Sequence, residues 1–292
     1  MVRHFLVLSH IGRNRHESLL RKFSLNSNSL TINELRIVLT IERVVARLEN
    51  SAELRSHLVF KGGFVLLKVL ESDRFTRDLD ALCKGIEKKD AQDLIKEALL
   101  TDLEDGFWFG EIRVQNLEEQ GEYGALRFDC AYFLGDPPKE KSKLAKLSRV
   151  HFDVGFGDKV IGKLSPIKSP PLLPNGEPIS WKVYPLESIY SEKLETLVQR
   201  GDANSRAKDI YDMTVIFDAC KDTDKLSKAI LATFKTRSTE LPGSFSDFAA
   251  NLNLRQLKSS WGSVQLSEEA ATFESFWELL LVQFKKLDRI LD

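Results

Sequence analysis

Two aspartates stand two positions apart in the segment Thr76-Arg77-Asp78-Leu79-Asp80, and their spacing suits metal chemistry. Residues 77–83 alternate in character, so we expect a strand with Asp78 and Asp80 on one face and apolar side chains on the other. The two Cα atoms would then lie about 7 Å apart. Mg²⁺ prefers carboxylates, waters and substrate phosphates as ligands. The pair therefore predicts a Mg²⁺ site suited to an in-line displacement at phosphorus.

A pair of glycines precedes this strand. Lys61-Gly62-Gly63 separates a short apolar run, residues 58–60, from residues 64–70, which we expect to form a buried helix. Adjacent glycines at the start of a helix let backbone N–H groups approach a phosphate closely. The turn is therefore a candidate binding site for the phosphates of a nucleotide.

Asp153 is the candidate for a third carboxylate. Residues 149–156 alternate cleanly, and Val150, Phe152, Val154 and Phe156 share one face while Asp153 lies on the other. A carboxylate at the centre of such a strand must be solvated, paired or bound to a metal.

Lys193 lies on an expected helix, residues 186–200, between Ile189 and Leu197 at four residues on either side. A lysine on a largely apolar stripe can reach into a cleft and contact phosphates. The alternative is that it extends to water or forms a structural pair with Asp209 or Asp212.

The expected secondary structure that positions these residues changes near residue 181, from mixed helices and strands to helices alone. Before it we expect a helix at 32–48 and strands at 58–60, 77–83, 107–114, 123–133 and 149–156, with a helix at 88–103. The proline-rich stretch 165–178 reads as an irregular connection. After it we expect only helices, at 186–200, 205–220, 223–236 and 266–291. Residues 1–29 form a basic, weakly defined lead-in.

The composition excludes several classes of protein. With 42 Lys and Arg against 43 Asp and Glu, the chain carries no overall charge that would indicate nucleic-acid binding or DNA readout. The three cysteines, Cys83, Cys130 and Cys220, form no CxxC pair, so neither a disulfide framework nor a zinc ribbon is indicated. The apolar run near the N-terminus is too short for a signal peptide or a membrane span. We expect a cytoplasmic protein without a membrane contact.

The motifs and their order resemble those of the AbiEii-type nucleotidyltransferase family, whose members include toxins of bacterial toxin–antitoxin systems. The first motif reads Lys61-Gly62-Gly63 followed by Arg74-Phe75-Thr76-Arg77-Asp78-Leu79-Asp80, and the later one reads Glu192-Lys193, Arg200 and Lys208-Asp209-Ile210-Tyr211-Asp212. The resemblance covers roughly residues 58–215. One position departs from the pattern: a small or hydroxyl-bearing residue often follows the second glycine, and here it is Phe64.

The resemblance implies an α+β fold: a mixed sheet of the polymerase β-like nucleotidyltransferase type with flanking helices, followed by a C-terminal helical bundle. Residues 1–184 would form the nucleotidyltransferase domain with its N-terminal helices, and residues 185–292 a helical domain that completes the active-site cleft. Mg²⁺ would be the cofactor and an NTP the co-substrate. The acceptor would be tRNA or another RNA, and a cognate antitoxin would be the protein partner.

The resemblance also assigns roles to individual residues. Mg²⁺ would be held by Asp78, Asp80 and Asp153. These three acids, together with Lys193 and Asp209, would be the catalytic residues. The nucleotide would contact Lys61, Gly62, Gly63, Arg74, Thr76 and Lys193. Two other functions stay open: transfer to a small molecule or a protein, and a non-catalytic nucleotide- or RNA-binding module.

A lysine-rich stretch, residues 139–149, lies between two expected strands and reads as a loop. Its cations are the best local candidates for contact with an RNA backbone, although a run of charge often serves only solvation.

Overall fold

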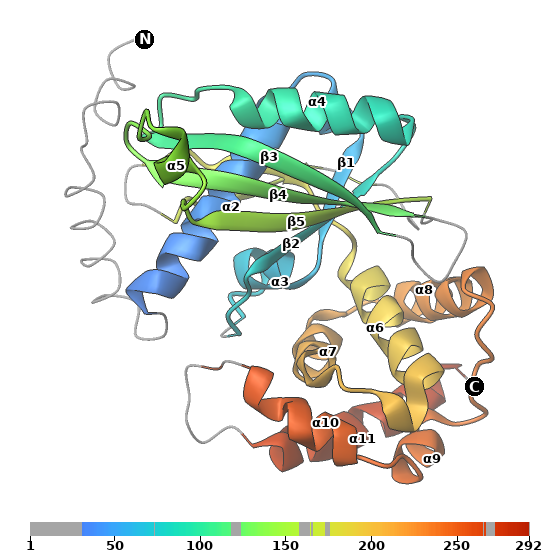
Figure 1. Cartoon of the computed structure of the whole chain (residues 1–292). Helices are drawn as coiled ribbons and strands as arrows, with labels where there is room; N and C mark the ends of the chain where they lie inside the picture. Colours follow the sequence, from blue (N-terminus) through green and yellow to red (C-terminus); the bar gives the residue numbers. More distant parts are fainter. Residues whose placement is uncertain are drawn as a thin grey trace. The chain divides into compact units, whose positions relative to one another are not determined.

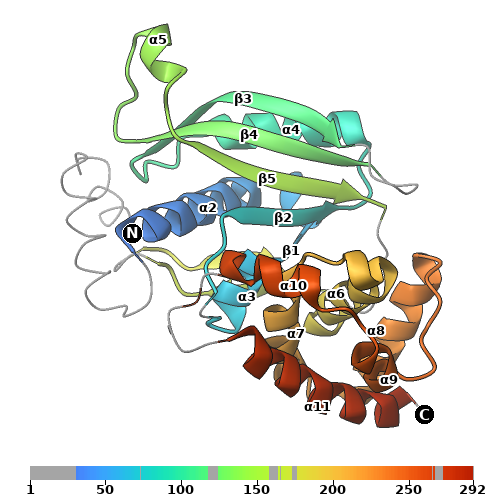
Figure 2. The ribbon, with the colours of Figure 1, turned by 60° about the horizontal axis from the view of Figure 1, so that its bottom comes forward.

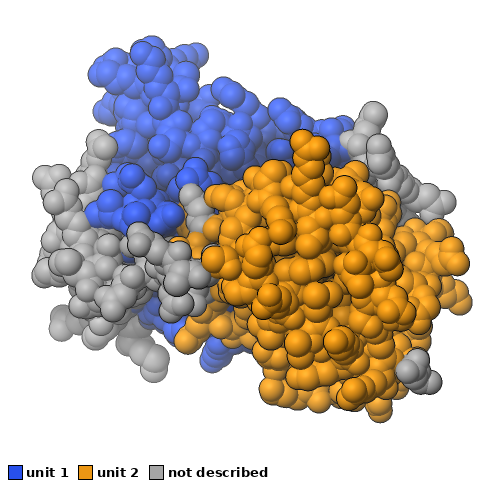
Figure 3. Space-filling model, turned by 90° about the horizontal axis from the view of Figure 1, so that it is seen from below, with its two compact units in different colours: residues 1–68, 76–158, 165–183 blue, residues 69–75, 159–164, 184–292 orange. Residues whose placement is uncertain are grey.

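The chain folds into two compact units, each assembled from separate stretches of sequence (Figure 3). The computed structural model describes residues 31–72, 74–117, 124–157, 164, 166–172, 176–264, 266 and 272–291, so the expected lead-in 1–29 lies outside the described residues. Unit 1 comprises residues 1–68, 76–158 and 165–183; unit 2 comprises 69–75, 159–164 and 184–292. The functional domains expected at 1–184 and 185–292 stay a prediction.

Unit 1 is built on a five-stranded mixed sheet with the strand order β1-β2-β5-β4-β3. β2 and β5 run parallel, and the other neighbouring strands run antiparallel. The strands are β1 (Leu58–Lys61), β2 (Asp78–Cys83), β3 (Phe107–Leu117), β4 (Ala125–Leu134) and β5 (Arg149–Phe156).

Helices α2 (Ile32–Asn50) and α4 (Lys88–Leu100) pack against each other and cover one face of this sheet (Figure 1). The face beneath them is apolar because alternate strand residues point into it: Phe128 and Phe152 stack there with ring centroids 4.8 Å apart, and both are fully buried. α2 begins with a capping box between Thr31 and Glu34, which satisfies free N–H groups at its first turn. The opposite face of the sheet carries the polar side chains.

Two short strands, β6 (Pro166–Ser169) and β7 (Ile179–Lys182), form a separate antiparallel pair. The expectation of an irregular connection over 165–178 is therefore wrong for residues 166–169. The prolines obscured the pairing, although an edge strand tolerates a proline at its first position. Trp181 of β7 is buried and donates a hydrogen bond to Ser169, which fixes the two strands together.

Unit 2 is helical, as expected: α6 (Leu186–Arg200), α7 (Ala207–Ala219), α8 (Thr223–Thr236), α9 (Phe245–Ala250), α10 (Arg255–Ser260) and α11 (Phe273–Leu291). α6 packs against α7 and α8, and α11 packs against α7, α8 and α9. The short helices α9 and α10 were not anticipated. Asp288 of α11 fastens α9 by accepting hydrogen bonds from the backbone N–H groups of Phe245 and Ser246. None of the helices in the described ranges combines the length and apolar character that crossing a bilayer requires.

The fold predicts a pH-dependent contribution from Glu49 near the end of α2. Burial raises the pKa of Glu49 from 4.5 to about 7 despite Lys182 and Arg55 nearby, and its buried Oε1 has no hydrogen-bond partner within the described residues. The folded protein therefore holds a proton that the unfolded chain releases between pH 4.5 and 7, so stability falls as the pH rises through this window.

Glu49→Gln should remove the loss of stability that accompanies deprotonation of Glu49 above pH 4.5. We expect the variant to be more stable than the parent at pH 8 by about 1 kcal/mol, less than the full shift implies because the side chain is only partly buried. The two proteins should be equal near pH 4.5. Urea unfolding at both pH values measures this, with exposed Glu53→Gln as the control. Equal stability of parent and variant at pH 8 would contradict the prediction.

Candidate active site

The polar face of the unit 1 sheet gathers the acids singled out in the sequence. Asp78 and Asp80 lie on the same face of β2, with Asp78 exposed and Asp80 half-buried. The parallel pairing of β2 with β5 sets Asp80 directly opposite Asp153. Neighbouring strands are about 4.8 Å apart. The sheet register therefore brings all three carboxylates to one region of one face.

Gly62 is built against this region. It follows β1, has φ +78°, and a Cβ placed on it would lie 2.1 Å from Asp80 Oδ2. No L-residue fits there without displacing the carboxylate. The carbonyl of Gly62 accepts a hydrogen bond from the N–H of Leu66. This bond closes the first turn of α3 (Gly63–Val69). Lys61, the last residue of β1, pairs in register with Asp80.

Thr76 supports the start of β2. Its hydroxyl accepts from the backbone N–H of Asp78 at 3.4 Å, and the side chain is almost fully buried. In this structure Thr76 therefore fixes the backbone before Asp78. The expected contact of Thr76 with a nucleotide phosphate stays a prediction.

Arg127 of β4 was not anticipated, and it lies beside Asp153. Its Nε and Nη2 donate to Asp153 Oδ1 and Oδ2 at 2.8 and 2.7 Å. The hydrogen bonds and charge of Asp153 raise the pKa of Arg127, with smaller contributions from Asp78 and Asp80. The alternation of residues 125–134 could have revealed it, because Arg127 and Asp129 fall on the face opposite Leu126 and Phe128.

The donor set fits a hard divalent cation through Asp78 and Asp80. Among the residues that the structure describes, no three His, Cys, Asp or Glu side chains already form a metal-binding group. Asp153 uses both oxygens on Arg127, but a carboxylate has further lone pairs and can accept an arginine while binding a metal. A Mg²⁺ site on these carboxylates, with or without Asp153, stays a prediction; Asp78 and Asp80 supply the oxygen ligands that Mg²⁺ prefers.

Unit 2 collects the remaining charged candidates in a buried network. Lys193 of α6 donates to Asp209 Oδ1 at 2.5 Å and lies 2.9 Å from Asp212 Oδ2, both on α7. Arg74 donates through Nε and Nη2 to the two oxygens of Asp212 at 2.7 and 2.9 Å. Arg206 donates to Asp209 at 2.6 Å. Lys193 therefore adopts the paired arrangement that the sequence left open.

The network favours the charged forms of Asp209 and Lys193. Burial alone would raise the pKa of Asp209, but Lys193 and Arg206 outweigh it and lower the pKa to about 2. Burial would likewise lower the pKa of Lys193, and Asp209 and Asp212 outweigh it and raise that pKa. Arg74 is 5% exposed and its guanidinium is committed to Asp212. It is better placed to position α7 than to contact a phosphate directly.

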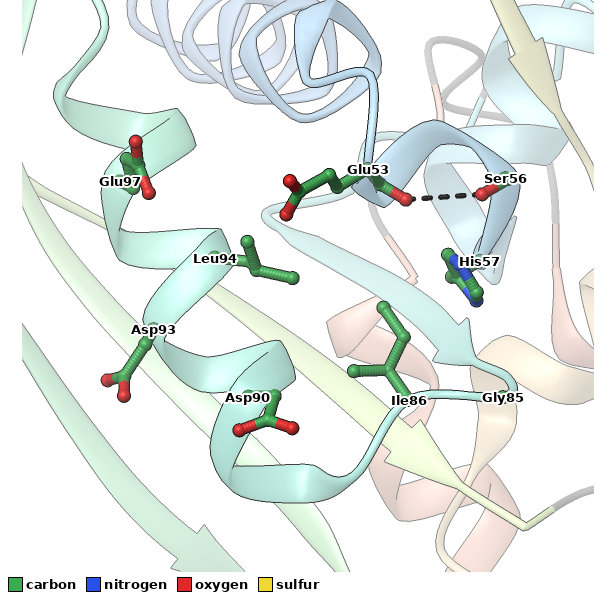
Figure 4. Close-up of a pocket in the computed structure, with 9 residues that line it drawn as sticks. All are labelled: Glu53, Ser56, His57, Gly85, Ile86, Asp90, Asp93, Leu94 and Glu97. Atoms are coloured by element: carbon green, nitrogen blue, oxygen red, sulfur yellow. Dashed lines mark hydrogen bonds between the residues drawn. The ribbon is translucent and has the colours of Figure 1, made fainter.

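A surface pocket of unit 1 lies away from these residues (Figure 4). It is lined by α4, by the loop after β2 and by residues 53–57 ahead of β1, at the opposite end of β2 from Asp78. None of its lining residues is a lysine or arginine, and four are acidic: Glu53, Asp90, Asp93 and Glu97. A triphosphate would be repelled there, so this pocket is not a candidate nucleotide site.

The family of the chain follows from its sequence match. The family model described as nucleotidyl transferase AbiEii toxin, type IV toxin–antitoxin system, matches residues 43–280 of 292. This chain belongs to the AbiEii family. It is a nucleotidyltransferase of a toxin family, and nucleotidyltransferases of this kind generally use a divalent metal. No curated protein sequence matches it.

Solved structures agree with this AbiEii assignment at the level of the fold. The nucleotidyltransferase toxin MenT4 of Mycobacterium tuberculosis is 16% identical, with a TM-score of 0.60 over 93% of this chain and 89% of that one. JHP933 of Helicobacter pylori is 14% identical, with a TM-score of 0.54 over 90% and 95%. The expected α+β nucleotidyltransferase fold is confirmed.

The departure from the AbiEii pattern after Gly63 has a structural explanation. Phe64 is buried and packs edge-on against Trp181 of β7, with ring centroids 5.7 Å apart. The side chain at this position belongs to the core of unit 1. The Phe64 side chain therefore cannot supply the hydroxyl contact to a phosphate that this position often offers in the family.

Proposed function

We propose that this AbiEii nucleotidyltransferase transfers a nucleoside monophosphate from an NTP to the 3′-terminal hydroxyl of a tRNA, with Mg²⁺ held by Asp78 and Asp80. The observation that carries the proposal is the packing of Gly62 against Asp80. A glycine turn suited to phosphates lies directly against a carboxylate suited to the metal ion that accompanies them. A side chain at position 62 would prevent this approach, because its Cβ would lie 2.1 Å from Asp80 Oδ2. Structural packing alone gives no reason to expose a DxD pair beside such a turn.

The residues of unit 1 would have three roles: binding the phosphates, holding the metal and positioning the acceptor. The backbone of Gly62 and Gly63, with Lys61, receives the phosphates of the NTP. Asp78 and Asp80 would hold Mg²⁺, which would supply charge neutralisation at the triphosphate. Asp153 positions the acceptor hydroxyl, whose oxygen bonds to the α-phosphorus as the bond to the β-phosphate oxygen breaks. Pyrophosphate leaves, and the hydroxyl proton is released to water.

The buried network of unit 2 supports an auxiliary role. Lys193, held by Asp209 and Asp212, is a fixed cation with its side chain 13% exposed. A lysine in this state loses little conformational freedom when it contacts a phosphate. We propose that Lys193 contacts the triphosphate and that Asp209 orients it. A cognate antitoxin is the proposed protein partner, because the family belongs to toxin–antitoxin systems.

Labelling assays test the acceptor. Purified protein with Mg²⁺ and each α-³²P-labelled NTP in turn should label the 3′ end of tRNA, and a tRNA whose 3′ hydroxyl is oxidised with periodate should not be labelled. Label that enters protein or a small molecule, with none on RNA, would contradict the tRNA assignment while leaving the enzyme class intact.

A further inference from the structure

The sheet register gives the proposed site two sides. Gly62 follows β1, on one side of β2, while β5 and β4 lie on the other side. An in-line displacement needs the attacking oxygen and the leaving pyrophosphate on opposite sides of the phosphorus. With the phosphates at Gly62, the acceptor must approach across β5 and β4. This step rests on the proposed function.

Cations lie along that approach. Arg127 is two strands, about 10 Å, from Asp80, and its side chain is 46% exposed. Asp153 holds Nε and Nη2, which leaves Nη1 without a hydrogen bond to any described residue. Arg113 of β3, paired in register with Asp129 on the same face, is exposed and makes no ion pair within the described ranges.

The loop between β4 and β5 extends this positive surface. It enters β5 at Arg149, at the end of the sheet where β2 begins with Asp78. Figure 2 shows the loop, with α5 (Lys141–Leu144), projecting beyond the strands. Residues 135–148 carry four lysines against two acids. Lys143 pairs with Glu140, whereas the exposed side chains of three others have no partner among the described residues: Lys139, Lys141 and Lys146.

We propose that these cations form an acceptor surface, defined as Arg113, Arg127, Lys139, Lys141 and Lys146, that binds the phosphodiester backbone of a nucleic-acid strand. Its 3′ end reaches Asp78 and Asp80. A row of exposed cations running away from the catalytic acids, in which only Arg127 is paired with a carboxylate, matches a polyanion. A small-molecule acceptor would contact Arg127 at most and would be indifferent to the loop lysines.

Binding measurements test the acceptor surface independently of transfer. Anisotropy of a 5′-labelled RNA strand with a free 3′ hydroxyl, without NTP and between 50 and 200 mM salt, would be measured for parent, Arg127→Gln and Lys141→Gln/Lys146→Gln. Each phosphate contact on a single strand contributes about 0.7 to the slope of log affinity against log salt. The double variant should therefore lower the slope by about 1.4, which corresponds to a loss of affinity at 50 mM salt of roughly 60-fold.

The matched control is Lys89→Gln/Lys96→Gln, which removes two lysines from α4 on the covered face of the sheet. It should bind RNA like the parent, and thermal melting confirms that each variant folds. A DNA strand of the same sequence shows which nucleic acid the surface prefers. RNA affinity and salt slope unchanged in Lys141→Gln/Lys146→Gln would overturn the acceptor surface. RNA binding that depends on the lysines, with no label transferred by the parent, would instead refute the proposed function.

Discussion

Asp80→Asn should abolish nucleotide transfer while leaving the protein folded. The substitution keeps the shape of the side chain but removes the charge that we propose holds Mg²⁺ beside Gly62. Metal ions contribute several kcal/mol of charge stabilisation in such reactions, and each 1.4 kcal/mol is a factor of ten in rate. We therefore expect a loss on the order of 10³-fold in initial rate, measured by release of pyrophosphate.

The control for Asp80→Asn is Asp90→Asn/Asp93→Asn on α4. These acids line the pocket of unit 1 that carries none of the proposed site residues. The double variant should keep the parental rate. Transfer that persists in Asp80→Asn, or that is lost in the control, would show that the metal site has been assigned to the wrong carboxylates.

Gly62→Ala should inactivate the enzyme for a steric reason. The new Cβ would lie 2.1 Å from Asp80 Oδ2, so the carboxylate has to move by about 1 Å or more to restore van der Waals contact. A misplacement of 1 Å in a catalytic group can cost about 100-fold in rate. We expect a loss of that order in a variant that stays folded, as thermal melting beside the parent would show.

Gly135→Ala separates this clash from backbone strain. Gly135 also has positive φ, +91°, but a Cβ there has nothing within 4 Å. Both alanine variants should lose about 1 kcal/mol of stability, the cost of alanine in a conformation that favours glycine, and only Gly62→Ala should lose activity. Similar activity losses in the two variants would mean that strain, rather than contact with Asp80, explains the requirement for glycine.

The sequence predicted the strands of the proposed site because polar and apolar residues alternate along a half-buried strand. Asp78, Asp80 and Asp153 alternate with apolar residues, and their faces follow directly. What the sequence could not supply was the register between strands that are distant in the chain. The pairing of Asp80 with Asp153, and of Asp153 with Arg127, depends on the strand order of the sheet.

The charged residues of unit 2 show a second limit. An aspartate three residues from another on a helix predicts a shared face, but not which cations it will meet. Arg74 lies 138 residues from Asp212 in sequence, and only the fold brings them together. Burial of such a pair is stable only when its hydrogen bonds are complete. Arg74 was therefore assigned to a phosphate from its motif, whereas its structural partner is a carboxylate.

The short elements were hidden for a simpler reason. α9 and α10 are six residues each, too short for the helical period to stand out from the surrounding polar sequence. β6 begins at a proline, which usually argues against a strand. In each case tertiary contacts, such as those of Asp288 with α9, stabilise a segment whose local sequence is ambiguous.

The most direct test is to locate the divalent cation. Crystals grown with Mn²⁺ and an NTP analogue that cannot be cleaved between the α- and β-phosphates would show the metal by its anomalous signal. We expect the peak within coordination distance of Asp78 and Asp80, with the triphosphate against Gly62 and Gly63. A peak among the acids of the α4 pocket, or a triphosphate bound away from the glycine turn, would contradict the account.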